Sequence, residues 1–314
     1  RGIGVIRVLF TGYAPVHFLC FRPLYERLRA DPNVEVTVAG GLREYGAVLH
    51  HDAPGLYRPL GVPDAAIASL AEVEGRDYDI LFAANTKVMA PRSARLRVQL
   101  FHGLSFRNKA VRPDNLGCDF YFMAGPYMRR KFADANMFAA GDPRALEIGF
   151  LKTDRLVNGA LDREALRRAL ELPHGPVVLY APTGQVDNSL ETFGEAALDA
   201  LSAWNGATVL VKLHDHPKNR SIDWQARLRR FHGSRVRLVT EPDVIPLLHL
   251  ADLLITDASS VFPCDFARSS TSLAKSSGKA MFTSPTISNA LTCCTLSRNI
   301  VSAASGVNRP AIKP

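Results

Sequence analysis

The sequence has no run of about 18 uninterrupted apolar residues, which argues against a helix that spans a membrane. No signal peptide is visible at the amino end, where the chain leads at once into an apolar segment. Five cysteines are present, but none has metal-ligand or redox spacing, because the only close pair, Cys293 and Cys294, is adjacent. These absences favour a reduced cytoplasmic protein without a bound metal.

Acidic residues are missing from residues 268–314, which contain six Lys or Arg and no Asp or Glu. This segment therefore accounts for 6 of the formal net charge of +8 and leaves +2 for all preceding residues. That balance gives no reason to expect a nucleic-acid partner, and no nucleic-acid-binding motif is present. Since the segment also lacks helical or strand periodicity, we predict an irregular or foreign tail.

Apolar strand-like segments alternate with helical ones in the first half of the chain. Residues 5–11 form an apolar run, residues 16–29 carry apolar side chains at helical spacing, and residues 34–39 alternate. Further strands are predicted at residues 80–83, 98–101 and 119–123. This order predicts a parallel sheet with helices on both faces.

The same alternation restarts in the second half, after about residue 155. Strands are predicted at 177–180, 208–212, 236–239 and 253–256, and helices at 162–170, 190–204 and 244–250. We therefore predict an α/β protein with two Rossmann-like doubly wound domains in the glycosyltransferase-B architecture, the second domain incomplete. The predicted domains cover residues 1–150 and 151–267 and are followed by the tail, 268–314.

His102 and Gly103 follow the apolar strand predicted at 98–101. In parallel sheets, ligands bind next to the carboxyl ends of the strands. A histidine there has a pKa near the working pH and can act as a general base, while Gly103 would let a ligand approach the backbone. The alternative is a structural histidine that binds a neighbouring carbonyl group.

Lys212 ends a predicted strand in the second domain and is followed by His214 and His216. A cationic lysine and imidazoles at a strand end suit a pyrophosphate, whose oxygens accept charge-assisted hydrogen bonds. A metal site and a solvated polar loop are the alternatives.

Small polar residues follow two other strands of this domain. Thr256 ends the strand at 253–256, and Asp257, Ser259 and Ser260 follow it, where a helix start would offer backbone N–H groups and hydroxyls to an anion. Simple helix capping is the alternative. Thr183 follows the strand at 177–180 and would lie at the same edge of the sheet, with an ordinary turn as the alternative.

Taken together and in this order, these motifs resemble the CDP-glycerol glycerophosphotransferase family, which makes teichoic-acid-type polymers. The resemblance extends over residues 95–266 and is carried by His102-Gly103, the junction from Gly149 to Asp154, Tyr180-Ala181-Pro182-Thr183, Lys212-Leu213-His214, and Thr256 to Ser260 followed by Asp265-Phe266. Gly184, the expanded Lys212-to-Pro217 motif and the missing carboxyl-terminal helices depart from the family pattern.

The resemblance implies transfer of glycerol phosphate, or a similar polyol phosphate, from a CDP-activated donor to a hydroxyl of a polymer or lipid-linked primer. It implies that residues 1–150 form the acceptor-side domain and residues 151–267 the nucleotide-binding domain. It further implies His102 as base and His214 as a group that steadies charge on the donor diphosphate, with Thr183, Ser259 and Ser260 on phosphate oxygens. His216 is the alternative to His214. No cofactor besides the donor is implied, and the protein is expected in the cytoplasm, with peripheral contact to the inner face of the plasma membrane.

Two other functions remain open from the sequence. One is a UDP-N-acetylglucosamine 2-epimerase or another nucleotide-sugar glycosyltransferase on the same fold, because fold alone does not determine function. The other is a truncated, non-catalytic relative that binds a nucleotide.

Overall fold

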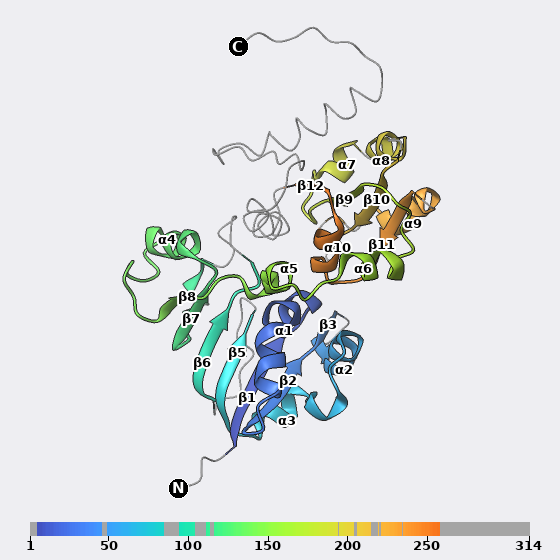
Figure 1. Ribbon diagram of the computed structural model, residues 1–314. Helices are drawn as coiled ribbons and strands as arrows, with labels where there is room; N and C mark the ends of the chain where they lie inside the picture. The colour runs from blue at the N-terminus through green and yellow to red at the C-terminus, as the bar shows by residue number, and fades with distance from the viewer. Residues whose placement is uncertain are drawn as a thin grey trace. The chain divides into compact units, whose positions relative to one another are not determined.

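The computed structural model describes residues 5–45, 49–84, 94–103, 111–113, 116–193, 195–203, 206–214, 219, 221–233 and 235–257. The chain divides into two compact units, Arg1–Asp154 and Arg155–Pro314, and each contains its own parallel sheet (Figure 1). The predicted tail, 268–314, and the predicted domain end at residue 267 lie outside the described residues.

The first unit contains one sheet of six parallel strands in the order β2-β1-β5-β6-β7-β8. They are β1 (Ile6–Gly12), β2 (Val34–Gly40), β5 (Tyr78–Ala83), β6 (Ala94–Leu100), β7 (Phe120–Met123) and β8 (Ala145–Glu147). The chain passes from β1 outward to β2 and then resumes on the other side of β1 with β5. The strand order therefore reverses between β1 and β5, and ligands of open α/β sheets bind at such a switch point.

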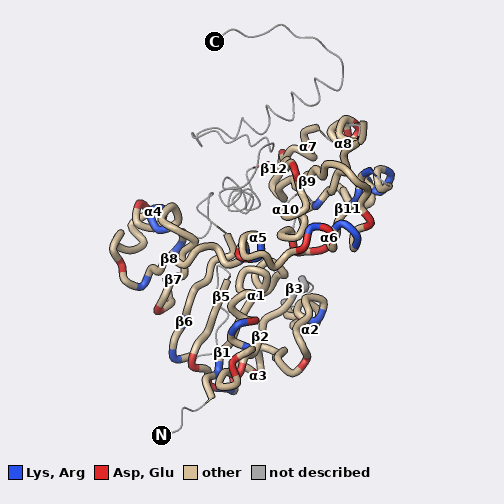
Figure 2. Tube along the Cα trace, viewed as in Figure 1, with Lys and Arg blue, Asp and Glu red and all other residues tan. Residues whose placement is uncertain are grey.

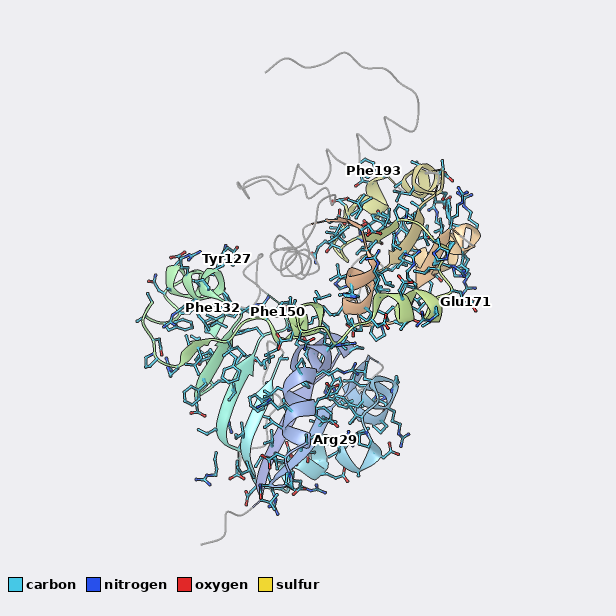
Figure 3. The ribbon with its side chains drawn as sticks, viewed as in Figure 1. Arg29, Tyr127, Phe132, Phe150, Glu171 and Phe193 are labelled. Atoms are coloured by element: carbon cyan, nitrogen blue, oxygen red, sulfur yellow. The ribbon has the colours of Figure 1, made fainter. Side chains whose placement is uncertain are left out.

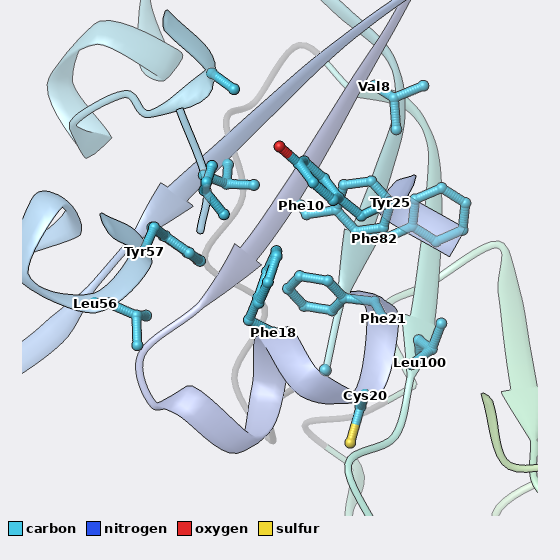
Figure 4. Packing of buried hydrophobic residues seen from close by; sticks show 14 of the residues in the cluster. Val8, Phe10, Phe18, Cys20, Phe21, Tyr25, Leu56, Tyr57, Phe82 and Leu100 are labelled. Carbon is cyan, nitrogen blue, oxygen red and sulfur yellow. The ribbon is translucent and has the colours of Figure 1, made fainter. Parts of the chain in front are cut away.

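Helix α1 (Pro15–Arg29) covers one face of this sheet. Its first turn contains Pro15, whose fixed φ suits a helix start. Phe21 of the helix packs on Phe10 of β1 with 4.8 Å between ring centroids, and Phe10 stacks on Phe82 of β5 at 4.9 Å (Figure 4). Burying each such ring contributes about 1.5–3 kcal/mol, so this aromatic cluster anchors the β1–α1 junction to β5.

Shorter elements accompany this sheet in the described part of the first unit. They are the antiparallel hairpin of β3 (Leu42–Tyr45) and β4 (Leu49–Asp52), the helices α2 (Ala53–Tyr57), α3 (Leu70–Glu74) and α4 (Pro126–Asp134), and the 3-10 turns η1 (Arg58–Leu60) and η2 (Asp64–Ala66). Helix α3 begins with a capping box, in which Ser69 and Glu72 each bind the other's backbone. Val73 of α3 packs with Leu9 and Leu81, on the sheet face opposite α1.

The first unit ends with the 3-10 turn η4 (Leu151–Thr153), which packs on α1. Phe150, labelled in Figure 3, and Leu151 both lie against the aromatic core of the unit. These contacts explain why the first unit extends to Asp154, whereas the sequence placed the boundary after residue 150.

The second unit contains four parallel strands in the order β11-β10-β9-β12. They are β9 (Val177–Ala181), β10 (Thr208–Lys212), β11 (Val236–Val239) and β12 (Leu253–Thr256). Here the order reverses between β9 and β12, which makes the ends of these two strands the second switch point.

Six helices and a 3-10 turn accompany this sheet in the described part of the second unit. They are α5 (Asp154–Val157), α6 (Arg163–Ala169), α7 (Ser189–Phe193), α8 (Glu195–Ser202), α9 (Trp224–Leu228), η5 (Arg229–Phe231) and α10 (Ile245–Leu250). The single helix predicted over 190–204 corresponds to two, α7 and α8.

Lys and Arg are concentrated on α6 and near α9 (Figure 2). An ion pair between Arg163 and Asp252 attaches α6 to the sheet. The Asp252 carboxylate accepts hydrogen bonds from the Arg163 guanidinium at 2.9 Å and from the Val177 N–H at 2.9 Å. The Asp252 carboxylate therefore fixes α6 against the amino-terminal end of β9.

Candidate functional site

His102 lies at the carboxyl edge of the first sheet, beside the switch point between β1 and β5. Strand β6 ends at Leu100, and the half-buried His102 side chain turns back to β5. Its Nδ1 donates a hydrogen bond to the carbonyl of Ala84, the residue after β5. Because a carbonyl can only accept, the neutral ring carries its proton on Nδ1 and the lone pair on Nε2.

The surroundings of His102 lower the pKa of its imidazole. Burial is the largest cause, and the ammonium of Lys152 also lowers the pKa, whereas the hydrogen bond to Ala84 raises it. Lys152, in η4, is itself buried. His102 is therefore neutral at pH 7, and its Nε2 can accept a proton, as a general base must.

A second histidine, His17 in the first turn of α1, lies against His102. The ring centroids are 4.6 Å apart, and the ring planes meet at 58°. Sequence analysis did not select His17, although it follows a strand end as His102 does. Its place near the start of a helix, just after the Gly12-Tyr13-Ala14-Pro15 turn, was the signal that could have found it.

Gly103 is half-buried and follows His102 in the described part of the chain. The prediction that it lets a ligand approach the backbone stays a prediction.

In the second unit, Asp257 joins three segments at the switch point between β9 and β12. Its carboxylate accepts hydrogen bonds from the Thr183 N–H at 2.8 Å, the Ser189 N–H at 3.1 Å and the Ser189 hydroxyl at 3.2 Å. Thr256 donates its hydroxyl to the Ala181 carbonyl at 2.6 Å. Asp257 and Thr256 therefore fix the loop after β9 and the start of α7.

Tyr180 extends this network into the core of the second unit. Its hydroxyl lies 2.9 Å from the Ser189 hydroxyl, and burial raises the pKa of the phenol. Tyr180 therefore stays neutral and keeps Ser189 oriented toward Asp257. The structure thus brings together Thr183, Thr256 and Asp257, which the sequence had predicted as substrate-binding residues. Direct contact of these residues with a substrate stays a prediction.

Lys212 and His214 lie at the end of β10, the neighbour of β9 on the side away from β12. Lys212 is buried, and its ammonium donates to the Leu213 carbonyl at 3.0 Å, whereas His214 is exposed. A buried cation at a strand end suits an anionic ligand. The other predicted residues, His216, Ser259 and Ser260, lie outside the described residues.

The described residues contain neither a cluster of metal ligands nor a membrane-spanning helix. Within those ranges, no three His, Cys, Asp or Glu side chains gather closely enough to hold a metal ion. No helix in the same ranges is long and apolar enough to cross a membrane.

Residues 94–269, more than half of the chain, match the sequence model of a family described as CDP-Glycerol:Poly(glycerophosphate) glycerophosphotransferase. The matched range contains His102, Thr183, Lys212, His214 and Asp257. No curated protein matches the sequence.

Several solved structures are similar to this chain. The wall teichoic acid polymerase TagF has a TM-score of 0.60 and 18% identity, over 84% of this chain and 68% of that one. A histidine-to-asparagine variant of TagF soaked with CDPG has a TM-score of 0.57 and 18% identity, over 83% and 67%. UDP-GlcNAc 2-epimerase from Neisseria meningitidis, bound to UDP-GlcNAc, has a TM-score of 0.54 and 11% identity, over 82% and 78%. These similarities confirm the predicted α/β fold of the glycosyltransferase-B class.

Proposed function

Because this chain belongs to the CDP-glycerol:poly(glycerophosphate) glycerophosphotransferase family, we propose that it transfers glycerol phosphate from CDP-glycerol to a hydroxyl group of a growing polymer or primer. The observation that carries the proposal lies inside the matched range. His102 is a neutral imidazole at a switch point, with Nδ1 bound to Ala84 and Nε2 as its basic nitrogen.

The proposed reaction is a displacement at phosphorus. The acceptor oxygen forms a new bond to the phosphorus that carries glycerol, and the bond from that phosphorus to the bridging oxygen breaks. CMP leaves with that electron pair, and the hydroxyl proton passes to Nε2 of His102. Little covalent chemistry is asked of the protein, so catalysis rests on positioning and on stabilisation of charge.

The second unit would supply the donor-binding groups. Lys212 and His214 would offset charge on the diphosphate, with His216 as the alternative to His214. The loop that Asp257 holds would present Thr183 to a phosphate oxygen, together with Ser259 and Ser260. Thr256 and Asp257 would contact the donor or support the residues that do, and Gly103 would leave room beside the base.

The similarity to TagF supports this choice of donor, because one TagF structure was soaked with CDPG. We propose the CDP-activated donor as a substrate, without a separate cofactor. The acceptor would be a polymer or a lipid-linked primer. A lipid-linked acceptor would bring the protein to the inner face of the plasma membrane, which co-flotation with primer-containing vesicles would detect.

A nucleotide-release assay tests the proposal. The protein is given CDP-glycerol, CDP-ribitol or UDP-GlcNAc, each with and without acceptor, and the released nucleotide is identified by chromatography. We expect acceptor-dependent CMP release from a CDP-polyol donor. Release of UDP, or epimerised UDP-sugar without CMP, would overturn the proposal, and binding of CDP without turnover would support a non-catalytic relative.

His102→Ala provides the catalytic control for this assay. It should reduce CMP release by roughly 10²–10⁴-fold and leave CDP affinity unchanged, because a general base acts in the reaction and not in binding. His174→Ala changes an exposed histidine of the second unit and should leave release unchanged.

A further inference from the structure

His17 is a buried polar side chain that contacts the proposed base. Only 2% of the residue is exposed, and its ring lies 4.6 Å from that of His102. The two residues come from different elements, the first turn of α1 and the loop after β6. Burying an imidazole is costly unless its nitrogens are bound, so the position of this ring requires an explanation.

The turn between β1 and α1 fixes the His17 ring from several sides. Its Nδ1 accepts a hydrogen bond from the Tyr13 N–H at 3.1 Å, and the Tyr13 ring stands edge-on to it at 4.4 Å. Gly12 lies so close that a Cβ there would come within 2.7 Å of the His17 Cβ. Because Nδ1 accepts, the neutral His17 ring carries its proton on Nε2, and protonation of Nδ1 would break the bond to Tyr13.

A hydrogen bond at one nitrogen does not by itself fix the orientation of an imidazole ring. The hydrogen bond to Ala84 fixes one nitrogen of His102 but not the tilt of the ring about that bond. A rigid ring packed against its side restricts this rotation. Base catalysis needs Nε2 in a fixed direction, since misplacement of about 1 Å can cost on the order of 100-fold in rate.

A neutral aromatic support also suits the charge that His102 acquires. Among the described residues, three groups interact with the base: the carbonyl of Ala84, the ammonium of Lys152 and the ring of His17. A carboxylate in the place of His17 would favour the protonated base before reaction. A neutral ring adds no net charge, so it leaves the base neutral before reaction and places no like charge beside the cation that forms when His102 takes the proton.

We propose that His17 is a positioning residue, whose ring holds the imidazole of His102 in the Nδ1–H tautomer with Nε2 directed at the acceptor. This inference rests on the proposed function for the role of His102, but the tautomer and orientation of His102 can be measured without any substrate.

The experiment separates the ring of His17 from its hydrogen bond. His17→Phe keeps an aromatic ring but cannot accept from Tyr13, whereas His17→Asn can accept at that position but has no ring. His17→Ala removes both, and His174→Ala is the surface control. The full chain is labelled with ¹⁵N-histidine, and long-range ¹H–¹⁵N spectra report the tautomer of each ring, with His102→Gln identifying the His102 signals.

We expect the Nδ1–H tautomer of His102 in the parent protein, in His17→Phe and in the surface control. His17→Asn and His17→Ala should show a mixture of tautomers. In the transfer assay, the same two variants should lose on the order of 10-fold to 100-fold in kcat, with the KM for the donor within about twofold of the parent.

Two results would overturn the proposal. One is a parent-like His102 tautomer and kcat in His17→Asn or His17→Ala. The other is loss of the tautomer in His17→Phe with retention in His17→Asn, which would show that His17 only satisfies the Tyr13 backbone. If neither the parent protein nor any variant transfers glycerol phosphate, the proposed function is wrong. The tautomer of His102 in each variant still shows whether His17 orients His102.

Discussion

The carboxylate of Asp257 accepts a hydrogen bond from the backbone N–H of Thr183 at 2.8 Å, although 74 positions separate the two residues. The contact forms because β12 and β9 are parallel neighbours, so that Thr256 pairs with Ala181 and the next residues leave the sheet together. Two segments that sequence analysis selected separately are thus one structural unit, in which Asp257 orders the loop that presents Thr183.

Asp257→Ala tests this ordering. Removal of the carboxylate leaves the N–H groups of Thr183 and Ser189 without their partner, which should lower the free energy of unfolding by about 1–2 kcal/mol. Chemical denaturation followed by circular dichroism measures the change. Asp199→Ala, at an exposed position of α8, is the control and should change stability by less than about 0.5 kcal/mol. Equal stability of the two variants would show that Asp257 does not order the loop.

Gly12→Ala tests the close approach of the β1–α1 turn to His17. The added Cβ would meet the His17 Cβ at 2.7 Å, and neither atom belongs to a flexible chain end, so helix α1 must shift. We expect a loss of roughly tenfold in kcat and a lower Tm. Gly75→Ala, whose Cβ would have its nearest neighbour at 3.8 Å, should keep parent-like kcat. Parent-like transfer by Gly12→Ala would mean that His17 tolerates displacement.

The pH dependence of transfer should follow the ionisation of His102. Burial, together with Lys152, lowers its pKa below the ordinary value of about 6.5. Only the neutral base is active, so kcat/KM should be constant near pH 7 and fall with decreasing pH through a pKa below 6.5. Lys152→Met removes one cause of the lowering and should move this acidic limb to higher pH. If the acidic limb of the pH–rate profile is unchanged in Lys152→Met, Lys152 does not lower the pKa of His102.

Asp154→Asn should stabilise the protein at neutral pH. Burial raises the pKa of this half-buried carboxyl, so its ionised form destabilises the folded state. The cost is absent below the pKa of the unfolded chain, about 3.9, and is complete above the raised folded pKa. Calorimetry at pH 7 should show Tm higher by about 1–4 °C, and the gain should vanish near pH 3.

Asp162→Asn provides the opposite case. Backbone N–H groups, that of Ala165 first, lower the pKa of the Asp162 carboxyl at the start of α6. Its ionised form therefore stabilises the folded state above the unfolded pKa, and this stabilisation is lost as pH falls. Asp162→Asn should lower Tm at pH 7. A rise in Tm for both variants would contradict the assigned environments.

Several strands were predictable because they are short apolar runs that local sequence defines. Strands β10, β11 and β12 coincide with their predicted ranges. The β3–β4 hairpin and β8 were missed because, unlike the equally short β11 and β12, each contains at most two apolar residues and therefore forms no apolar run. Burial and long-range pairing, not local preference, determine such elements.

The site was predictable to the extent that strand ends identify it. His102 and Asp257 stand out because each follows an apolar strand, and parallel sheets bring such positions to one edge. Contacts across the sheet were not predictable. The pairing of His17 with His102 depends on β1, β5 and β6 being neighbours, and the bond from Thr183 to Asp257 depends on β12 lying beside β9.

The central claim is that His102 accepts the acceptor's proton while glycerol phosphate moves from CDP-glycerol. Phosphorus NMR of a reaction with CDP-glycerol and acceptor tests it most directly, because diphosphate, CMP and a new phosphodiester give separate signals. The parent protein should convert the diphosphate into CMP and phosphodiester in equal amounts, and His102→Ala should bind the donor yet form neither product at a comparable rate. Phosphodiester formation by His102→Ala within about threefold of the parent rate, or CMP with free glycerol phosphate as the only products, would contradict it.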